Sequence, residues 1–192
     1  MDVVNYLSVL GLTLVVAGWL VSYYLAKKKE IRLSVLKWKK EQIDKQLELL
    51  YGPIFAILME NKGSRDVLRD AFCRGTLFEY AEKLNEKENE EYTKYLENTL
   101  IPNNRKIVEI IRNNLYLVPD SNISKNFIEF IKYSKKIEYI HSHMKSHKEP
   151  YGQHGYENYH ADFQKEIQDM VVKLKKEQWS LVNKYRPKKK DN

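Results

Sequence analysis

The chain has 192 residues, of which 43% are hydrophobic and 31% are charged, and its formal net charge is +7. This length suffices for one packed core and is short for two, and the single cysteine, Cys73, excludes a disulfide framework and an all-cysteine metal site. Much of the positive charge lies beside an apolar N-terminal run and in the tail, so the excess favours lipid contact, and no direct nucleic-acid binding is expected.

The N-terminal run from Val3 to Ala26 carries no charge and predicts a transmembrane helix over residues 1–26. At ~1.5 Å per residue, this run is long enough to cross a hydrocarbon core of about 30 Å. Basic residues follow it at once, which predicts a single pass with the N-terminus outside and the bulk of the chain in the cytoplasm. The residues that we expect to contact lipid headgroups are Lys27, Lys28, Lys29 and Arg32. A buried core helix is the alternative, but globular helices seldom carry so long an uncharged run.

One face of this predicted span carries small residues. At ~100° per residue, a narrow arc holds Ser8, Gly11, Val15, Gly18 and Ser22. Small side chains let helix backbones approach closely, so we predict that this face mediates self-association, with a monomeric helix as the alternative. Away from this arc, the candidate pore-lining residues, should several copies form a ring, are Asn5 and Thr13.

Residues 27–186 predict an all-α, up-and-down bundle in the cytoplasm, and residues 187–192 form a basic tail. Apolar residues that recur at three and four positions predict helices over 27–61, 65–73, 88–115, 124–148 and 161–185. Gly52-Pro53 and Pro102 predict kinks or boundaries, because proline removes a hydrogen bond and crowds the preceding turn. Asn61–Ser64 predicts a helix stop followed by a new start.

The segment after Gly75 is acidic and has two interpretations. Thr76–Glu79 has the pattern of a capping box, which predicts a helix start. The charge run that follows is typical of a solvated helix tip, and the alternative is a docking surface for a basic partner. The glutamates that would form this docking surface are Glu86, Glu88, Glu90 and Glu91.

The sequence shows no catalytic set. The histidines cluster at His141, His143, His147, His154 and His160. The pair at 143 and 147 is spaced to hold a metal on one helix face, but no acid lies between them as in zincins, so we favour a hydrophilic helix end. His141 falls on an apolar stripe and is predicted to be a core histidine with a hydrogen-bonded neighbour. With no phosphate loop and no nucleophile elbow, we predict a non-enzyme without metal or cofactor.

One short motif bears on ribonuclease chemistry. The HEPN ribonuclease class carries an arginine, usually followed by a polar residue, with a histidine four to six residues later. Arg112 and Asn113 match the opening of this motif, but no histidine follows at that distance. We therefore interpret Arg112 and Asn113 as a degenerate HEPN position and expect no ribonuclease activity.

Several stretches together resemble a known family. They are Leu47–Leu58 (LELLYGPIFAIL), Pro102–Arg105, Arg112–Leu115 and the tyrosine-rich loop before the last helix. With the predicted span, this layout resembles small membrane-anchored helical proteins of bacterial antiviral operons, and in particular the accessory membrane protein of type VI-B CRISPR systems. The resemblance implies a HEPN-like bundle that assembles into a pore in the bacterial inner membrane and strengthens RNA-guided defence.

From these observations we expect a membrane-anchored homo-oligomeric effector that forms a pore or perturbs the inner membrane during antiphage defence. Its expected partners are copies of itself and the lipid bilayer, and the resemblance adds a CRISPR effector complex or another defence protein. One alternative is a passive membrane-tethered scaffold that recruits a cytosolic partner. The second alternative is a degenerate HEPN-type ribonuclease.

Overall fold

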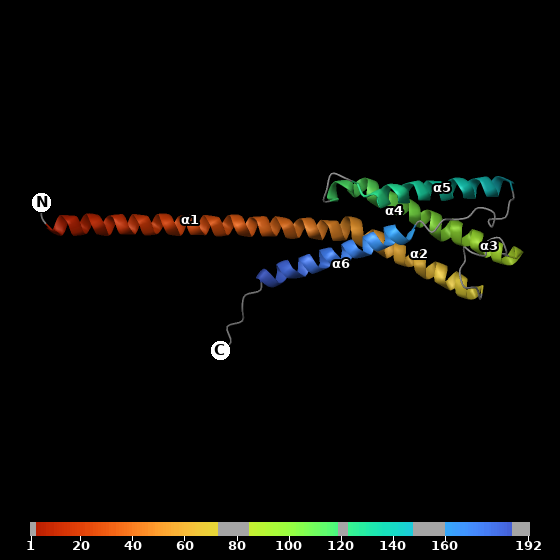
Figure 1. Ribbon diagram of the computed structural model, residues 1–192, viewed down its shortest axis with the longest axis horizontal. Helices are drawn as coiled ribbons and strands as arrows, with labels where there is room; N and C mark the ends of the chain where they lie inside the picture. The colour runs from red at the N-terminus through yellow and green to blue at the C-terminus, as the bar shows by residue number, and fades with distance from the viewer. Residues whose placement is uncertain (1–2, 73–84, 119–122, 148–159, 186–192) are drawn as a thin grey trace, which may run out of the picture. The chain divides into compact units, whose positions relative to one another are not determined.

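The computed structural model describes residues 3–72, 85–118, 123–147 and 160–185, with the side chains of 3–10, 147, 160 and 185 left aside. These residues form a helical bundle, and none of the described residues forms a strand (Figure 1). The predicted all-α fold class is confirmed. The predicted capping box at Thr76–Glu79, the tyrosine-rich loop before the last helix and the tail at 187–192 lie outside the described residues.

Some of the α-helices are followed directly by a short π-helical or 3₁₀ segment, labelled η. In chain order they are α1 (Val3–Lys45), η1 (Gln46–Tyr51), α2 (Gly52–Ala71), α3 (Glu86–Tyr95), η3 (Leu96–Leu100), α4 (Ile101–Asn114), η4 (Leu115–Leu117), α5 (Lys125–His147) and α6 (His160–Tyr185). The chain divides into two compact units, Met1–Gln42 and Ile43–Asn192. The predicted domain boundary after Ala26 lies inside α1, because the helix continues without a break into the lysine-rich segment.

The predicted single-pass placement in the inner membrane is contradicted. Within the part of the chain that the structure describes, no helix combines the length and the apolar character needed to cross a bilayer.

The two prolines predicted to kink the chain each follow a wide, π-helical turn. The Gly52 amide donates to the Leu47 carbonyl, five residues back, and the next residue is Pro53. The Ile101 amide donates in the same way to the Leu96 carbonyl, immediately before Pro102. A wide turn gives the proline ring room against the preceding turn, where an ordinary α-helix would crowd it. Both helices therefore continue past their prolines.

The predicted helix stop at Asn61–Ser64 is wrong, because α2 runs without interruption from Gly52 to Ala71. Asn61 is a weak helix former, but here its side chain is buried at 8% exposure and bonded to α4. Gly63 lies inside the helix with open space around it. Tertiary contacts thus override the local stop signal.

The core of the second unit is built from the apolar stripes that the sequence predicts. α2 packs against α4 and α6, α4 packs against α5, and α5 packs against α6. Phe127 meets Phe163 edge to face at 5.5 Å between ring centroids, and Phe130 stacks on Phe163 at 4.3 Å. Buried positions from the predicted stripes include Ile43, Leu50, Ile54, Leu58, Ile137, Met144, Ile167, Val171, Leu174 and Leu181.

Two glycines of α2 provide a matched test of this packing. A Cβ added at Gly52 would meet the backbone carbonyl of Leu47, which cannot move aside as a side chain would. Gly52→Ala is therefore expected to lower the free energy of unfolding by about 1–3 kcal/mol. Gly63→Ala, with nothing near the added atom, is expected to raise it by up to about 1 kcal/mol. Urea unfolding of both variants measures the difference, and equal effects would contradict the role of the wide turn.

Candidate functional site

A buried cluster of three amides joins α2 to α4. Asn61, Asn103 and Asn104 are 8%, 3% and 1% exposed. The Asn103 amide donates to the Asn61 side-chain oxygen at 2.9 Å, and the Asn61 amide lies 3.5 Å from the Asn104 oxygen. Among the described residues, the Asn104 side-chain nitrogen has no hydrogen-bond partner. Buried polar groups that bond to one another across two helices penalise any shift of α2 along α4, so this cluster fixes the register of the two helices.

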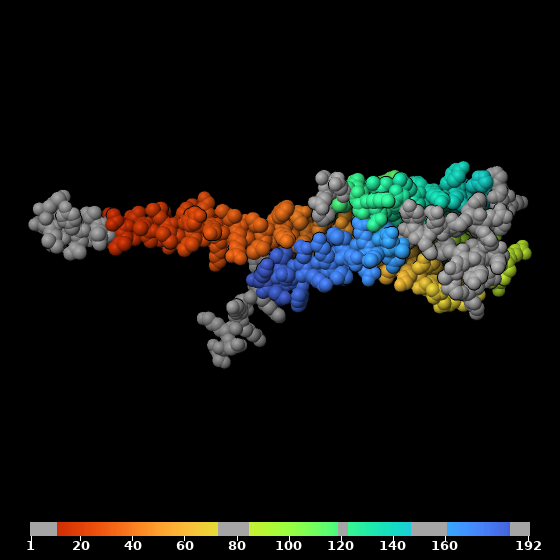
Figure 2. All heavy atoms as spheres, in the orientation of Figure 1, coloured from red at the N-terminus to blue at the C-terminus, as the bar shows by residue number. Residues whose placement is uncertain are grey.

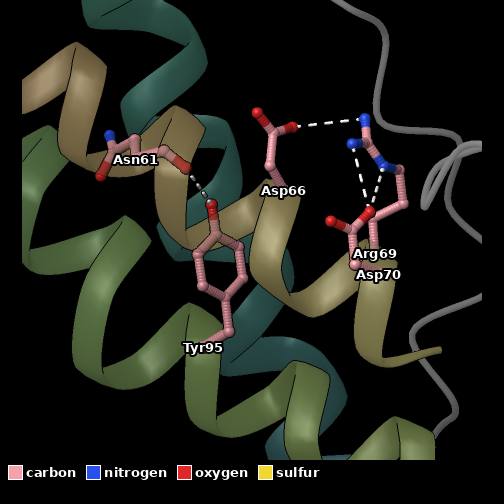
Figure 3. Close-up of polar contacts among 5 residues, drawn as sticks. All are labelled: Asn61, Asp66, Arg69, Asp70 and Tyr95. Atoms are coloured by element: carbon pink, nitrogen blue, oxygen red, sulfur yellow. Dashed lines mark hydrogen bonds and ion pairs between the residues drawn. The ribbon is translucent and has the colours of Figure 1, made fainter.

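Tyr95 attaches α3 to the same point of α2. Its hydroxyl donates to the Asn61 backbone carbonyl at 3.4 Å, and Figure 3 shows the ring reaching across from α3 to α2. Burial raises the pKa of Tyr95 to about 12, so the hydroxyl keeps its proton and remains a donor at neutral pH. Arg69, in the same figure, bridges Asp66 and Asp70 at 3.3 Å, and such exposed pairs add little stability. The buried contacts of Asn61 and Tyr95 therefore hold α2, α3 and α4 together.

Removal of the central amide tests this interpretation. Asn61→Ala is expected to lower the free energy of unfolding by about 1–3 kcal/mol, because it leaves the buried Asn103 amide without its acceptor. Asn113→Ala, which truncates an exposed amide on α4, is the control and should change stability by less than about 0.5 kcal/mol. Denaturant unfolding of both variants provides the comparison. Equal stability of the two variants would show that the buried amides do not act as a register device.

A polar cleft lies between α4 and α5 and has a volume of about 350 Å³. Its lining consists of Arg105, Val108, Glu109, Arg112, Asn113, Ser134, Lys135 and Glu138. The α4 residues recur at three and four positions, so one face of that helix forms one wall. Arg112 and Asn113, which the sequence predicts as a degenerate HEPN position, thus belong to a cleft, and no histidine is among the described residues that line it.

The charges of the cleft are partly committed. Glu138 accepts from Arg105 Nε and from Lys135 Nζ, each at 2.9 Å. Burial alone would raise the pKa of Glu138, but the hydrogen bonds from Lys135 and Arg105 outweigh it and lower that pKa. Ser134, which also lines the cleft, is 1% exposed, and its hydroxyl has no hydrogen-bond partner among the described residues.

The second candidate site is the surface of α1. Its large apolar side chains are exposed along most of the described length, for instance Trp19 at 67% and Trp38 at 62%. Figure 2 draws this part of α1 in red and orange, and the exposed apolar residues between the two tryptophans are Leu20, Val21, Tyr23, Tyr24, Leu25, Ile31, Leu33 and Val35. The first unit is a single helix, so it has no core of its own in which to bury them.

The predicted self-association residues lie on this surface. Gly11, Val15, Gly18 and Ser22 are exposed, and a Cβ built at either glycine meets nothing within 4 Å. Thr13 is also exposed, as are the four predicted headgroup contacts, Lys27, Lys28, Lys29 and Arg32. The side chains of Asn5 and Ser8 lie outside the described residues. The structure therefore leaves the described part of the predicted stripe open for a neighbour.

The histidine cluster is only partly described. His141 is half-buried, and its Nε2 lies 3.2 Å from Glu97, in agreement with the predicted hydrogen-bonded neighbour. Lys145 also reaches Glu97 at 2.8 Å, and its hydrogen bond lowers the pKa of Glu97 against the opposing effect of desolvation. Within the described residues, no group of three or more potential metal ligands occurs. The side chains of His147, His154 and His160 lie outside the described residues, and His143 is exposed.

The acidic segment is less free for docking than its composition indicates. Glu88 forms a capping box with Asn85, each side chain accepting from the other residue's backbone amide at 2.9 Å. Glu90 and Glu91 both contact the Lys94 ammonium, at 2.9 and 3.1 Å. Three of the four predicted docking glutamates therefore already have partners in α3 or at its N-cap.

Sequence reasoning missed Ser134 and the amide cluster. Ser134 follows Phe127 by seven residues and precedes Ile137 by three, so it occupies a polar position on the apolar stripe of α5. That interruption is a signal for a buried polar group. The pair Asn103-Asn104 falls in the first turn of α4, where asparagines are usually solvated. No local pattern foretells that α2 covers them.

Comparison with known proteins adds no relative. No family model, no curated protein and no solved structure matches this chain. The resemblance to the type VI-B accessory protein and the HEPN-like character of the bundle therefore stay predictions.

Proposed function

We propose that this chain is a non-catalytic assembly protein that self-associates through α1 and presents its helical bundle to a partner. The observation that carries the proposal is the exposed apolar surface of α1. Contiguous apolar patches of this kind mark interaction surfaces, because their exposure to water is unfavourable. The first unit has only one helix, so the cover for this surface must come from outside that unit.

The occupants that fit best are further copies of the same chain. Between Gly11 and Ala26 the helix is apolar on all sides, with Leu12, Val16 and Leu20 exposed as well as the small-residue stripe. A helix that is apolar all round needs neighbours on more than one side, which favours several copies over a dimer. The open positions at Gly11 and Gly18 allow close backbone approach along one of these contacts.

The pore that the sequence predicts depends on a membrane span, so we do not carry it into this proposal. The antiviral setting and a defence complex as partner remain proposals that rest on the resemblance alone. The HEPN-like assignment of the bundle is also a proposal, supported by Arg112 and Asn113 at the end of α4. Because no histidine lines their cleft, we propose no ribonuclease activity.

Two exposed valines give a matched test of self-association. Val15 on α1 is 70% exposed and Val67 on α2 is 71% exposed. Val15→Glu is expected to dissociate the assembly to monomer, since it places a charge in the apolar contact, whereas Val67→Glu should leave the mass unchanged. Sedimentation equilibrium of the full-length protein measures the mass. A monomeric parent chain, or an unchanged mass for Val15→Glu, would overturn the proposal.

Ionic strength separates this proposal from the scaffold alternative. Residues 27–42 hold seven basic and two acidic side chains, so neighbouring copies repel one another there. Added salt screens that repulsion and should strengthen self-association through the apolar segment. Docking through the acidic face of α3 should instead weaken with salt, and Glu86→Lys with Glu90→Lys should abolish it. Glu88 is left intact in this variant because it caps α3.

A further inference from the structure

We propose that the cleft between α4 and α5 binds a small phosphorylated molecule, held by its phosphate group. This inference is independent of self-association, since it concerns the second unit alone. The cleft has about 350 Å³, which exceeds the size of a bare phosphate and lies at the lower end of the range for small-molecule sites. It therefore has room for a phosphate together with an attached sugar or nucleoside.

The first observation is the unpartnered hydroxyl of Ser134. This serine is 1% exposed, yet its hydroxyl has no hydrogen-bond partner among the described residues. A buried polar atom without a partner costs about 1–3 kcal/mol, so proteins rarely retain one without a use. Because Ser134 is part of the cleft lining, a ligand oxygen placed there would satisfy the hydroxyl.

The second observation is the charge of the lining. Three cationic side chains, Arg105, Arg112 and Lys135, face two carboxylates, Glu109 and Glu138. Arg105 and Lys135 both contact Glu138, so the carboxylate already offsets much of their charge. Among the described residues, no ion pair joins Arg112 to a carboxylate. Its guanidinium is therefore available to bind two oxygens of one anion.

Phosphate fits this set of donors better than a cation would. The planar guanidinium of Arg112 matches two phosphate oxygens, and the amide of Asn113 and the hydroxyl of Ser134 add neutral donors from the two walls. Glu109 would repel a second anionic group, but its carboxylate accepts hydrogen bonds from hydroxyl or amino groups. The ligand class is thus a monophosphate joined to a group rich in hydroxyls, as in a sugar phosphate or a nucleoside monophosphate.

Titration calorimetry of the full-length protein tests the site with four probes. We expect AMP or ribose 5-phosphate to bind, inorganic phosphate to bind more weakly and adenosine, which lacks phosphate, not to bind. A preference for AMP over ribose 5-phosphate identifies the nucleoside form of the class, and the reverse preference identifies the sugar phosphate. Equal binding of adenosine and AMP, or no binding of either phosphorylated probe, would overturn the proposal.

Three variants connect binding to the named residues. Arg112→Gln should weaken binding of the phosphorylated probes by 10-fold or more. Lys132→Gln is the matched control, because this exposed α5 lysine pairs with Glu129 outside the cleft. The affinity of this variant for the phosphorylated probes should stay within 2-fold of that of the parent protein. Ser134→Ala should weaken binding while the melting temperature of the ligand-free protein stays the same or rises, since the unpartnered hydroxyl is gone. A lower melting temperature with unchanged affinity would show that Ser134 is only structural and would overturn its role.

Discussion

The missing amide protons of Pro53 and Pro102 set the architecture of the bundle. Each proline interrupts the hydrogen bonds of a helix that must nevertheless continue, and each is accommodated by one wide turn before it. These turns are at the centre of the packing: η1 contacts α4 and α6, and η3 contacts α2. Both turns carry buried residues, and Leu50 and Leu96 are completely shielded from water. The irregular backbone is therefore inside the core, where neighbouring helices hold it in place.

From this centre, polar contacts fix how the helices align. Asn103 and Asn104 follow directly after Pro102, and both lie against Asn61 on α2. Tyr95, just before the second wide turn, bonds to the same residue. Apolar contacts tolerate sliding between helices, whereas sliding that separates a buried amide from its hydrogen-bond partner is costly. The second unit thus combines a large apolar core with a small polar lock, whereas the first unit has an apolar surface and no core.

Much of the bundle could be predicted from the sequence because its helices carry long apolar stripes. α5 and α6 begin and end within one residue of the predicted ranges. The prediction was wrong at Asn61–Ser64, where packing against α4 overrides the local helix-breaking residues. At the two prolines the sequence predicted kinks or boundaries, but not the wide turns that precede them. The predicted membrane span rested on the length of an uncharged run. Among the described residues, no helix combines the length and the apolar character needed to cross a bilayer, and the large apolar side chains described on α1 are exposed.

Only part of the candidate cleft could be predicted from the sequence, because the contacts that complete it join residues from two different helices. A sequence motif links residues that are close in the chain, and no histidine follows Arg112 at the four to six positions that the HEPN motif requires. The residues that complete its surroundings, Ser134, Lys135 and Glu138, come from α5 and meet α4 only because the two helices pack side by side. Arg105 and Glu138 form the ion pair that joins these walls. Glu138 pairs with two of the three cationic side chains of the cleft, so the number of basic residues overstates the positive charge that is free to bind a ligand. Arg112 is not among the partners of Glu138, and its position therefore determines where an anion can bind.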